Sequence, residues 1–173
     1  MDKTVVDLLV KYNSTVNEKM NAIIKTLTPD EWNRDLGGFF KSVRALCSHL
    51  YVSDYLLLKR YFNLRDFKLG ADAFFSREYK FLDLLFPEVD EYISARTELD
   101  GKIRDFCAEL TGEDFTHVLK FVDSRGTPLE KNFGGALLHG FNHGTHHRGM
   151  ISLYLEQMGK ANDFSPLMQV VEK

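Results

Sequence analysis

The sequence predicts an all-α protein, built as a bundle of four long helices. Four segments repeat apolar residues every three or four positions, which is the period of an α-helix that buries one face. Hydrophobic residues make up 44% of the 173 residues, enough to fill one core, and charged residues make up 27%. This length and composition predict one folded domain over residues 1–173 and argue against a disordered chain.

The composition also narrows the classes of function. The net charge is -3, whereas a nucleic-acid-binding domain usually carries a basic patch. No apolar run is long enough to cross a bilayer, and the N-terminus lacks the features of a signal peptide. The two cysteines, Cys47 and Cys107, lie within helical patterns and favour free thiols in a reducing compartment. We therefore expect a cytoplasmic protein that binds neither nucleic acid nor membrane.

The first part of the chain predicts two long helices with a capped turn between them. The helical period covers about residues 3–27 and, again, about residues 39–62. Between these segments, Thr28 and Glu31 have the spacing of a capping box, and Pro29 suits the first position of a helix. A short helical turn should therefore begin at Pro29.

A long connection follows, over about residues 63–87. Its periodicity is weak, but five apolar residues favour burial: Phe74, Phe75, Phe81, Leu84 and Leu85. We expect this connection to be partly helical and to pack over the bundle. Its length favours a crossover between helices over a tight helical hairpin.

Two more helices complete the predicted bundle, over about residues 88–110 and 133–158. The segment between them, about residues 116–131, alternates roughly with period two. It contains the turn sequence Asp123-Ser124-Arg125-Gly126, so we expect a small β-hairpin. Gly159 is a natural stop for the last long helix, and Ser165-Pro166 opens a final short one.

The histidines are the residues most indicative of function. There are six, of which four fall within nine positions: His49, His117, His139, His143, His146 and His147. Residues four apart on a helix lie about 40° apart around its axis, so His143 and His147 project the same way, as two ligands of one ion can. His147 lies on the apolar stripe of its helix, which predicts that the pair points into the bundle.

A third ligand would have to come from another helix. His49 is the other histidine with a core-side helical setting. Three neutral imidazoles that leave one position open are typical of a catalytic metal site rather than a structural one. We expect Zn²⁺ or Ni²⁺, with Fe²⁺ or Mn²⁺ as alternatives, and imidazole also suits Cu²⁺.

Other interpretations of these residues stay open at this point. A lone core histidine is more often a hydrogen-bonded polar group than a ligand, and the histidines could form a polar network without metal. Asp54 and Glu156 are candidate acid–base partners. Asp54, however, is five residues after His49, about 140° around the helix, and is better placed to orient an arginine or a helix end.

The last long helix resembles a known family. Residues 139–150 read HGFNHGTHHRGM, which resembles the H-x-x-N-H-x-x-H-H-R-G-Q signature of the DinB family, also called the DinB/YfiT-like metalloenzymes. Residues 42–54 resemble the family's second-helix segment, in which a histidine is followed shortly by an aspartate. One difference is Met150, which stands where the family commonly has glutamine.

This resemblance implies an up-down-down-up four-helix bundle, often a homodimer, in which His49, His143 and His147 bind a divalent metal. Four other residues would lie around these ligands: His139, Asn142, His146 and Arg148. Some relatives activate a low-molecular-weight thiol such as bacillithiol or mycothiol, so the resemblance implies a metal-dependent S-transferase or a hydrolase. A non-enzymatic, stress-associated bundle that binds a metal or a small ligand stays open.

Overall fold

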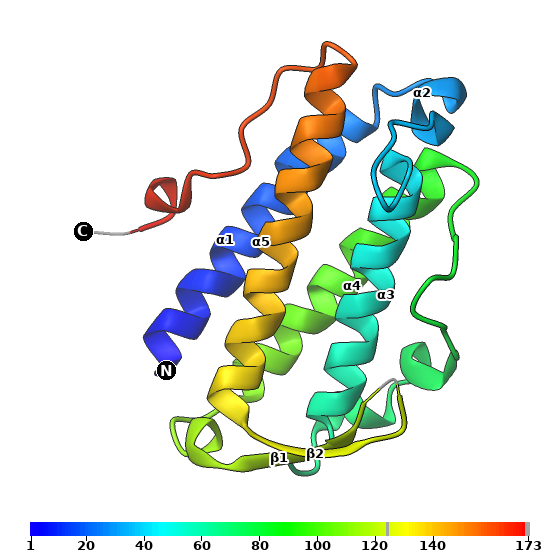
Figure 1. The fold of residues 1–173 in the computed structure, drawn as a ribbon. Helices are drawn as coiled ribbons and strands as arrows, with labels where there is room; N and C mark the ends of the chain where they lie inside the picture. The colour runs from blue at the N-terminus through cyan, green and yellow to red at the C-terminus, as the bar shows by residue number, and fades with distance from the viewer. Residues whose placement is uncertain (124, 172–173) are drawn as a thin grey trace.

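A computed structural model describes residues 1–123 and 125–171. Its four long helices are α1 (Lys3–Ile24), α3 (Val43–Tyr61), α4 (Val89–Glu109) and α5 (Phe133–Gln157). Helices α1 and α5 run in one direction and α3 and α4 in the other (Figure 1). Helix α1 packs on α4, and α3 packs on both α4 and α5. The prediction of an all-α, up-down-down-up bundle is therefore confirmed.

The predicted capping box is present at the start of α2 (Pro29–Asn33). The Thr28 hydroxyl accepts a hydrogen bond from the Glu31 N–H at 3.2 Å, and the Glu31 carboxylate accepts one from the Thr28 N–H at 2.8 Å. These reciprocal bonds satisfy two N–H groups that the first turn of a helix leaves without partners. The short helix orients the segment that leads to α3.

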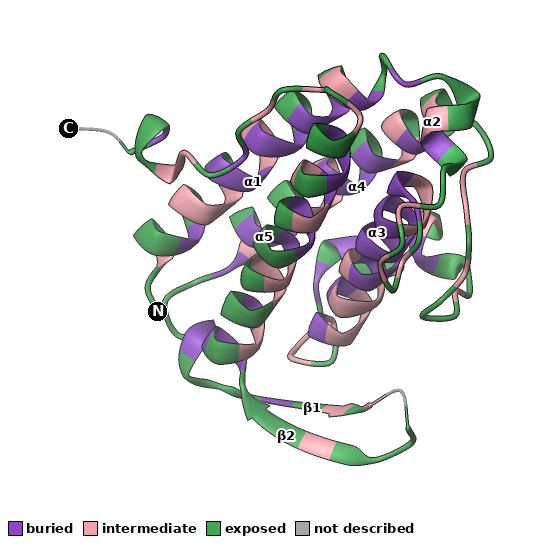
Figure 2. Cartoon of the chain, turned by 45° about the horizontal axis from the view of Figure 1, so that its top comes forward, coloured by how far each residue is buried: buried purple, intermediate pink, exposed green. Residues whose placement is uncertain are grey.

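Helix α3 begins later than the sequence pattern predicts. We expected a start near residue 39, but Lys41 has φ of 42°, a left-handed conformation that interrupts a helix. Ser42 then caps α3 by accepting a hydrogen bond from the Ala45 N–H at 3.2 Å. From Val43 onward α3 is buried along most of its length (Figure 2). Phe39 and Phe40 therefore lie in a loop beside the bundle instead of in the helix.

The connection between α3 and α4 runs back along the bundle, because the two helices point the same way (Figure 1). As expected it is partly helical, with the short 3-10 helices η1 (Lys68–Ala71) and η2 (Ala73–Ser76). The expectation that its apolar residues are all buried is wrong. Phe81 is 49% exposed and Leu84 is 57% exposed.

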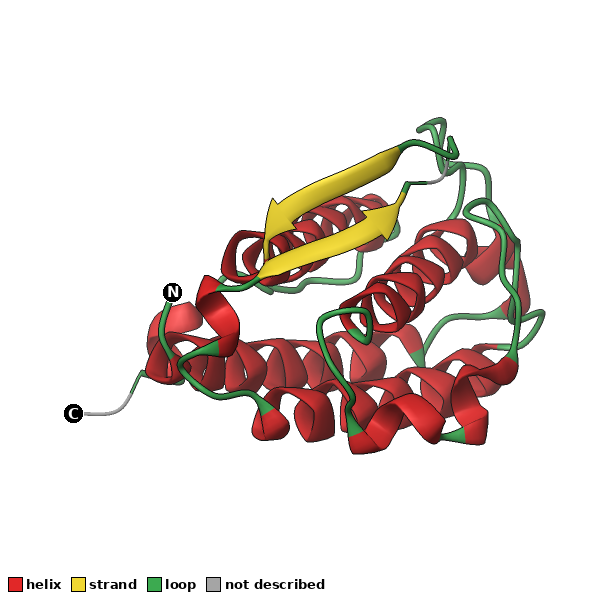
Figure 3. Cartoon of the chain, turned by 90° about the horizontal axis from the view of Figure 1, so that it is seen from below, coloured by secondary structure: helices red, strands yellow, loops and turns green. Residues whose placement is uncertain are grey.

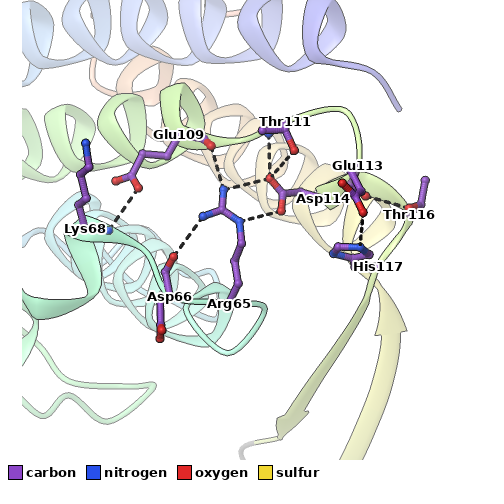
Figure 4. A network of polar contacts seen from close by, with 9 residues as sticks. All are labelled: Arg65, Asp66, Lys68, Glu109, Thr111, Glu113, Asp114, Thr116 and His117. Carbon is purple, nitrogen blue, oxygen red and sulfur yellow. Dashed lines mark hydrogen bonds and ion pairs between the residues drawn. The ribbon is translucent and has the colours of Figure 1, made fainter.

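A charged cluster links the segment after α3 to the turn after α4 (Figure 4). Arg65 donates hydrogen bonds to both carboxylate oxygens of Asp114 at 2.8 and 3.1 Å, and to the Glu109 carbonyl at 2.9 Å. Thr111 donates to the same carboxylate from its N–H and its hydroxyl. The bonds from Arg65 lower the pKa of Asp114 to about 2. This cluster positions the chain where it enters the hairpin.

The predicted hairpin is present. Strands β1 (Val118–Val122) and β2 (Pro128–Asn132) pair antiparallel and lie at the end of the bundle where α5 begins (Figure 3). Gly126 has φ of 83° in the predicted turn, of which Ser124 lies outside the described residues. Asn132 caps α5 by accepting a hydrogen bond from the Gly135 N–H at 3.0 Å. The hairpin thus leads directly into the helix that carries the histidine cluster.

The rest of the chain follows α5. Gly159 has φ of 74° just after the helix, as expected for its stop, and a last 3-10 helix, η4 (Leu167–Gln169), follows. Tyr12 on α1 donates a hydrogen bond to the Phe164 carbonyl at 2.7 Å, which holds this tail against the bundle. Within the described residues, no helix is long and apolar enough to cross a membrane.

A buried ion cluster joins α3 to α4 inside the bundle. Arg96 is fully buried and donates hydrogen bonds to Asp54 at 2.7 Å and to Asp100 at 2.6 Å. Burial works against the charge of Arg96, but Asp100 and Asp54 outweigh it and raise the pKa of the guanidinium. This confirms that Asp54 orients an arginine, as its position on the helix suggested.

Buried polar residues of α1 and α5 extend this ion cluster into a polar layer. Asn17 donates a hydrogen bond to Asp100 at 2.9 Å, and Arg148 donates to Asn13 at 2.6 Å and to Asn17 at 3.2 Å. Burial lowers the pKa of Arg148, whose hydrogen-bond acceptors among the described residues are neutral amide and hydroxyl groups. All four long helices therefore contribute to one polar layer, which lies where two apolar clusters of the core meet.

Candidate metal centre

The structure brings together the three histidines that the sequence singled out. The Nε2 atom of His147 on α5 lies 3.1 Å from Nε2 of His49 on α3 and 3.0 Å from Nε2 of His143. One ring nitrogen from each residue falls within 4.8 Å of the other two. His49 and His147 are buried and His143 is half-buried. The three rings thus converge on one point between two helices.

Local structure explains this convergence. His143 and His147 are one turn apart on α5, so helix geometry alone gives them a common direction. Helix α3 packs directly on α5, which brings His49 opposite that pair. Helix geometry thus determines the pair, and the packing of α3 on α5 adds the third ring.

Two aromatic side chains from the loops pack against the cluster. The ring of Phe40 stacks on His49 with centroids 4.3 Å apart, and the edge contact of Phe81 with His49 has centroids 4.7 Å apart. Phe40 also meets the ring of His147 at 5.6 Å. These rings remove water from His49 and lower the local polarity, which strengthens any interaction with a charge at the centre.

The surroundings keep the imidazoles neutral. Burial lowers the pKa of His49 to about 4, with a smaller contribution from His143, although a backbone hydrogen bond with Phe81 and the charge of Asp54 oppose this. Burial, followed by the neighbouring histidines, lowers the pKa of His147 to about 3. The pKa of His143 is lowered as well, again chiefly by burial. Neutral imidazole is the form that binds a metal ion.

The donor set fits a cation better than it fits a hydrogen-bond network. A neutral imidazole carries one N–H, and its other nitrogen offers one lone pair. Because Nε2 of His147 faces the other two Nε2 atoms, it cannot form a good hydrogen bond with both. Three converging lone pairs repel one another unless a positive charge lies between them. The buried Nδ1 atoms of His143 and His147 have no hydrogen-bond partner among the described residues, so these would carry the protons in that arrangement.

The other residues that the resemblance placed around the ligands lie mostly at the surface. His139, Asn142 and His146 are exposed. The ring of His139 is 6.0 Å from that of His143, and the ring of His146 is 4.8 Å from that of His147. Arg148 is buried but points toward α1. Among the described residues, none of these four hydrogen bonds to the three rings, so their role at the site stays a prediction.

Three residues that lie beside the cluster were not predicted to do so: Ser53, Phe40 and Phe81. The Ser53 hydroxyl lies 3.5 and 3.4 Å from the two ring nitrogens of His49. Its spacing of four residues from His49 on one helix was a usable signal. The two phenylalanines come from loops, and no periodic pattern could place them.

Two hollows adjoin the cluster from different sides. One, of about 450 Å³, is lined by His143, His139 and Arg60 among others. The other, of about 440 Å³, is lined by His49, Phe39 and Phe40 among others. Both are in the size range of sites for small molecules. The three histidines therefore lie between two places that can receive part of a small ligand.

Comparisons with known proteins agree with this architecture. The family model described as "DinB family" matches residues 1–164. Protein DinB of Bacillus subtilis (strain 168) is 24% identical over 154 residues, which cover 89% of this chain and 86% of that protein. No solved structure matches the chain significantly. With a family match over nearly its whole length and the histidine cluster in place, the chain belongs to the DinB family.

Proposed function

We propose that this protein binds one divalent metal ion through the Nε2 atoms of His49, His143 and His147. The observation that carries the proposal is the convergence of three neutral imidazoles, with neighbouring Nε2 atoms 3.0 and 3.1 Å apart. Zn²⁺ and Ni²⁺ suit this donor set first, and Fe²⁺ and Mn²⁺ are alternatives that depend on geometry and supply.

Different residues of the chain would bind the metal, exclude water from it and leave space for a ligand. A divalent ion supplies a Lewis acid, which lowers the pKa of a water or thiol that it binds. Phe40 and Phe81 keep water away from His49. The buried cluster around Arg96 holds α3 and α4 together below the histidines. The two hollows leave room for a small molecule beside the three rings.

We propose that the reaction is metal-dependent transfer of a low-molecular-weight thiol, of the bacillithiol or mycothiol kind, or a hydrolysis. Membership of the DinB family and the hollows beside the histidines support this. One observation favours a non-enzymatic alternative, a stress-associated bundle that binds a metal or a small ligand. Asp54 is engaged by Arg96 and Glu156 is exposed, so neither carboxylate is placed as a base next to the cluster.

We also infer that residues 1–173 work as one domain, in a cytoplasmic homodimer. Cys47 and Cys107 are free and buried, as expected in a reducing compartment. Leu138 and Leu153 on α5 are 48% and 53% exposed and offer apolar surface to a second copy. Light scattering on the purified protein tests the dimer, and a monomer at all concentrations would exclude it.

Metal analysis of untagged protein tests the metal site. We expect about one ion per chain in the wild type and little in His143→Ala, because the loss of one imidazole leaves too few ligands. His117→Ala is the matched control, since His117 is exposed beside the hairpin and far from the cluster in sequence. His146→Ala should also keep nearly all the metal. Full metal content in a folded His143→Ala variant would contradict the assignment.

A separate assay distinguishes the enzyme from the binding protein. Wild-type protein is assayed for conjugation of a thiol to an electrophile before and after removal of the metal by a chelator. Turnover that the chelator abolishes, and that added metal restores, supports the transferase. Binding of metal and thiol without turnover supports the non-enzymatic alternative.

A further inference from the structure

The hollow beside His143 continues toward the hairpin. A third hollow, of about 390 Å³, lies against β1 and β2 and shares Leu57, Arg60 and His139 with the one beside His143. The two hollows that share these three residues form one elongated depression between α3 and α5, which we call the α3–α5 groove. It begins at the histidine cluster and ends at the hairpin.

Arg60 lies in line with the metal site along this groove. It comes eleven residues after His49 on α3. At about 100° per residue, this is close to three full turns, so both side chains lie on nearly the same face of the helix, about 16 Å apart along its axis. Ser53 and Leu56 follow the same face between them. The groove therefore connects the three histidines with one arginine.

The charge of the groove has one sign. Its lining contains Arg60, Lys80 and Lys131, and neither hollow that forms it is lined by an aspartate or a glutamate. The hollow on the other side of the cluster differs, because two carboxylates, Asp35 and Asp83, line it with one cation, Lys41, which is paired with Asp35. The α3–α5 side of the cluster is therefore the side that favours an anionic group.

Among the residues that the structure describes, none accepts a hydrogen bond from the guanidinium of Arg60. Its contact among the described residues is the ring of Phe121, with the centroid 5.4 Å away. By contrast, Arg65 and Arg96 are each bound to carboxylates. Arg60 is half-buried and packs against Phe121, and both residues line the groove. A planar fork of this kind suits a carboxylate, which it can bind through two parallel hydrogen bonds.

The walls between the two ends of the groove are mainly apolar. Leu56, Leu57 and Phe81 line the hollow next to His143, and Leu119 and Phe121 line the hollow next to the hairpin. A ligand that reaches from the cluster to Arg60 would therefore lay an apolar stem along these side chains. Such a stem gains binding free energy by leaving water.

We propose that the α3–α5 groove binds an elongated small molecule whose carboxylate is received by Arg60 while its other end faces the histidine cluster. The orientation of the second end rests on the proposed metal function, whereas the role of Arg60 rests on the groove alone. Arg60 is then a specificity-determining residue that selects anionic substrates. Its distance from the cluster, about three helical turns, selects for length.

Two probes of equal length test the proposal: mercaptoundecanoate, which carries a carboxylate, and mercaptoundecanol, which carries a hydroxyl in its place. Their affinities are measured by calorimetry on metal-loaded and on metal-stripped protein. We expect the wild type to bind the carboxylate roughly tenfold more tightly, the ratio that one charge-assisted hydrogen-bonded pair gives. Arg60→Met keeps the apolar stem against Phe121 and should lose most of this preference, leaving only the weaker contribution of Lys80 and Lys131. Arg60→Lys should keep part of the preference.

The matched control is Arg104→Met, since Arg104 is an exposed arginine on α4 that lines none of these hollows. It should keep the wild-type preference. Equal affinity for both probes in the wild type, or an unchanged preference in Arg60→Met, would overturn the proposal. If the carboxylate preference needs Arg60 but metal adds nothing to thiol affinity, the groove inference stands and the thiol chemistry of the metal site fails.

Discussion

Two buried polar clusters share the helices of this bundle, and they are built in opposite ways. Around Arg96, groups of opposite charge meet, and the two nearby carboxylates of Asp54 and Asp100 each accept a hydrogen bond from the guanidinium. Around His147, three groups of the same kind meet, and their nitrogens point at one another. Both clusters include residues of α3, but among the described residues only the Arg96 cluster has partners of complementary charge.

This difference indicates what each cluster is for. A buried charge is stable when it is paired and hydrogen bonded, so the Arg96 cluster completes itself and fixes how the helices pack. Three neutral imidazoles gain little from one another. Their close approach needs a positive charge from outside the chain, which is the physical reason to interpret the second cluster as a binding site and the first as structure.

The comparison predicts its largest effect for the removal of Arg96, because the Arg96 cluster is interpreted as stabilising the fold. Arg96→Met leaves Asp54 and Asp100 without their cation in a buried layer, and breaking a buried ion pair costs about 3–5 kcal/mol. We expect a loss of this size in the free energy of unfolding, measured by urea denaturation of the metal-free protein.

Two outcomes are informative for this variant. Arg104→Met, on the same helix but exposed, should change the free energy of unfolding by less than about 0.5 kcal/mol. A loss in Arg96→Met that is as small as this would mean that the ion cluster does not stabilise the bundle.

The next effect is a response to acid. In the metal-free protein the pKa of His49 is lowered from 6.5 to about 4, so the unfolded chain binds protons in this range more readily than the folded one. The contribution of neutral His49 to the free energy of unfolding is therefore fully present above pH 6.5 and is lost as the pH falls toward 4. We expect a loss of about 3 kcal/mol from His49 alone, measured by urea denaturation at a series of pH values.

The charged cluster at the hairpin supplies a separate pH window. Asp114 has its pKa lowered from 3.8 to about 2, so its contribution is lost only as the pH falls from about 4 toward 2. His49→Gln should make the stability profile shallower between pH 6.5 and 4, where the slope that remains comes from His147 and His143, whose pKa values are also lowered. Asp114→Asn should make the profile shallower below pH 4. A profile for His49→Gln that follows the wild type throughout would contradict the burial-lowered histidine pKa.

The smallest effect concerns the contact between Ser53 and His49. At 3.4 and 3.5 Å the hydroxyl is at the long limit of a hydrogen bond, so Ser53→Ala should change the free energy of unfolding by about 0.5 kcal/mol or less. Metal affinity, measured by competition with a chelating dye, should fall about tenfold or less because the imidazole loses one orienting neighbour. A complete loss of metal would instead suggest that the hydroxyl itself is a ligand.

Sequence alone predicted the features that depend on near neighbours in the chain. The capping box of Thr28 and Glu31 and the common direction of His143 and His147 follow from helix geometry over a few residues. The period of apolar residues gave the four long helices with small errors at their ends. The start of α3 was missed because the left-handed backbone at Lys41 has no signature in a hydrophobic pattern.

Only the tertiary structure decided how distant segments meet. That His49 lies 3.1 Å from His147, that Phe40 and Phe81 cover it, and that Arg60 faces a groove are results of the packing of α3 on α5 and of the loops beside them. Spacing along one helix is fixed by covalent geometry and backbone hydrogen bonds. Contacts between helices depend on how whole helix faces fit together, and for that reason a local sequence pattern cannot predict them.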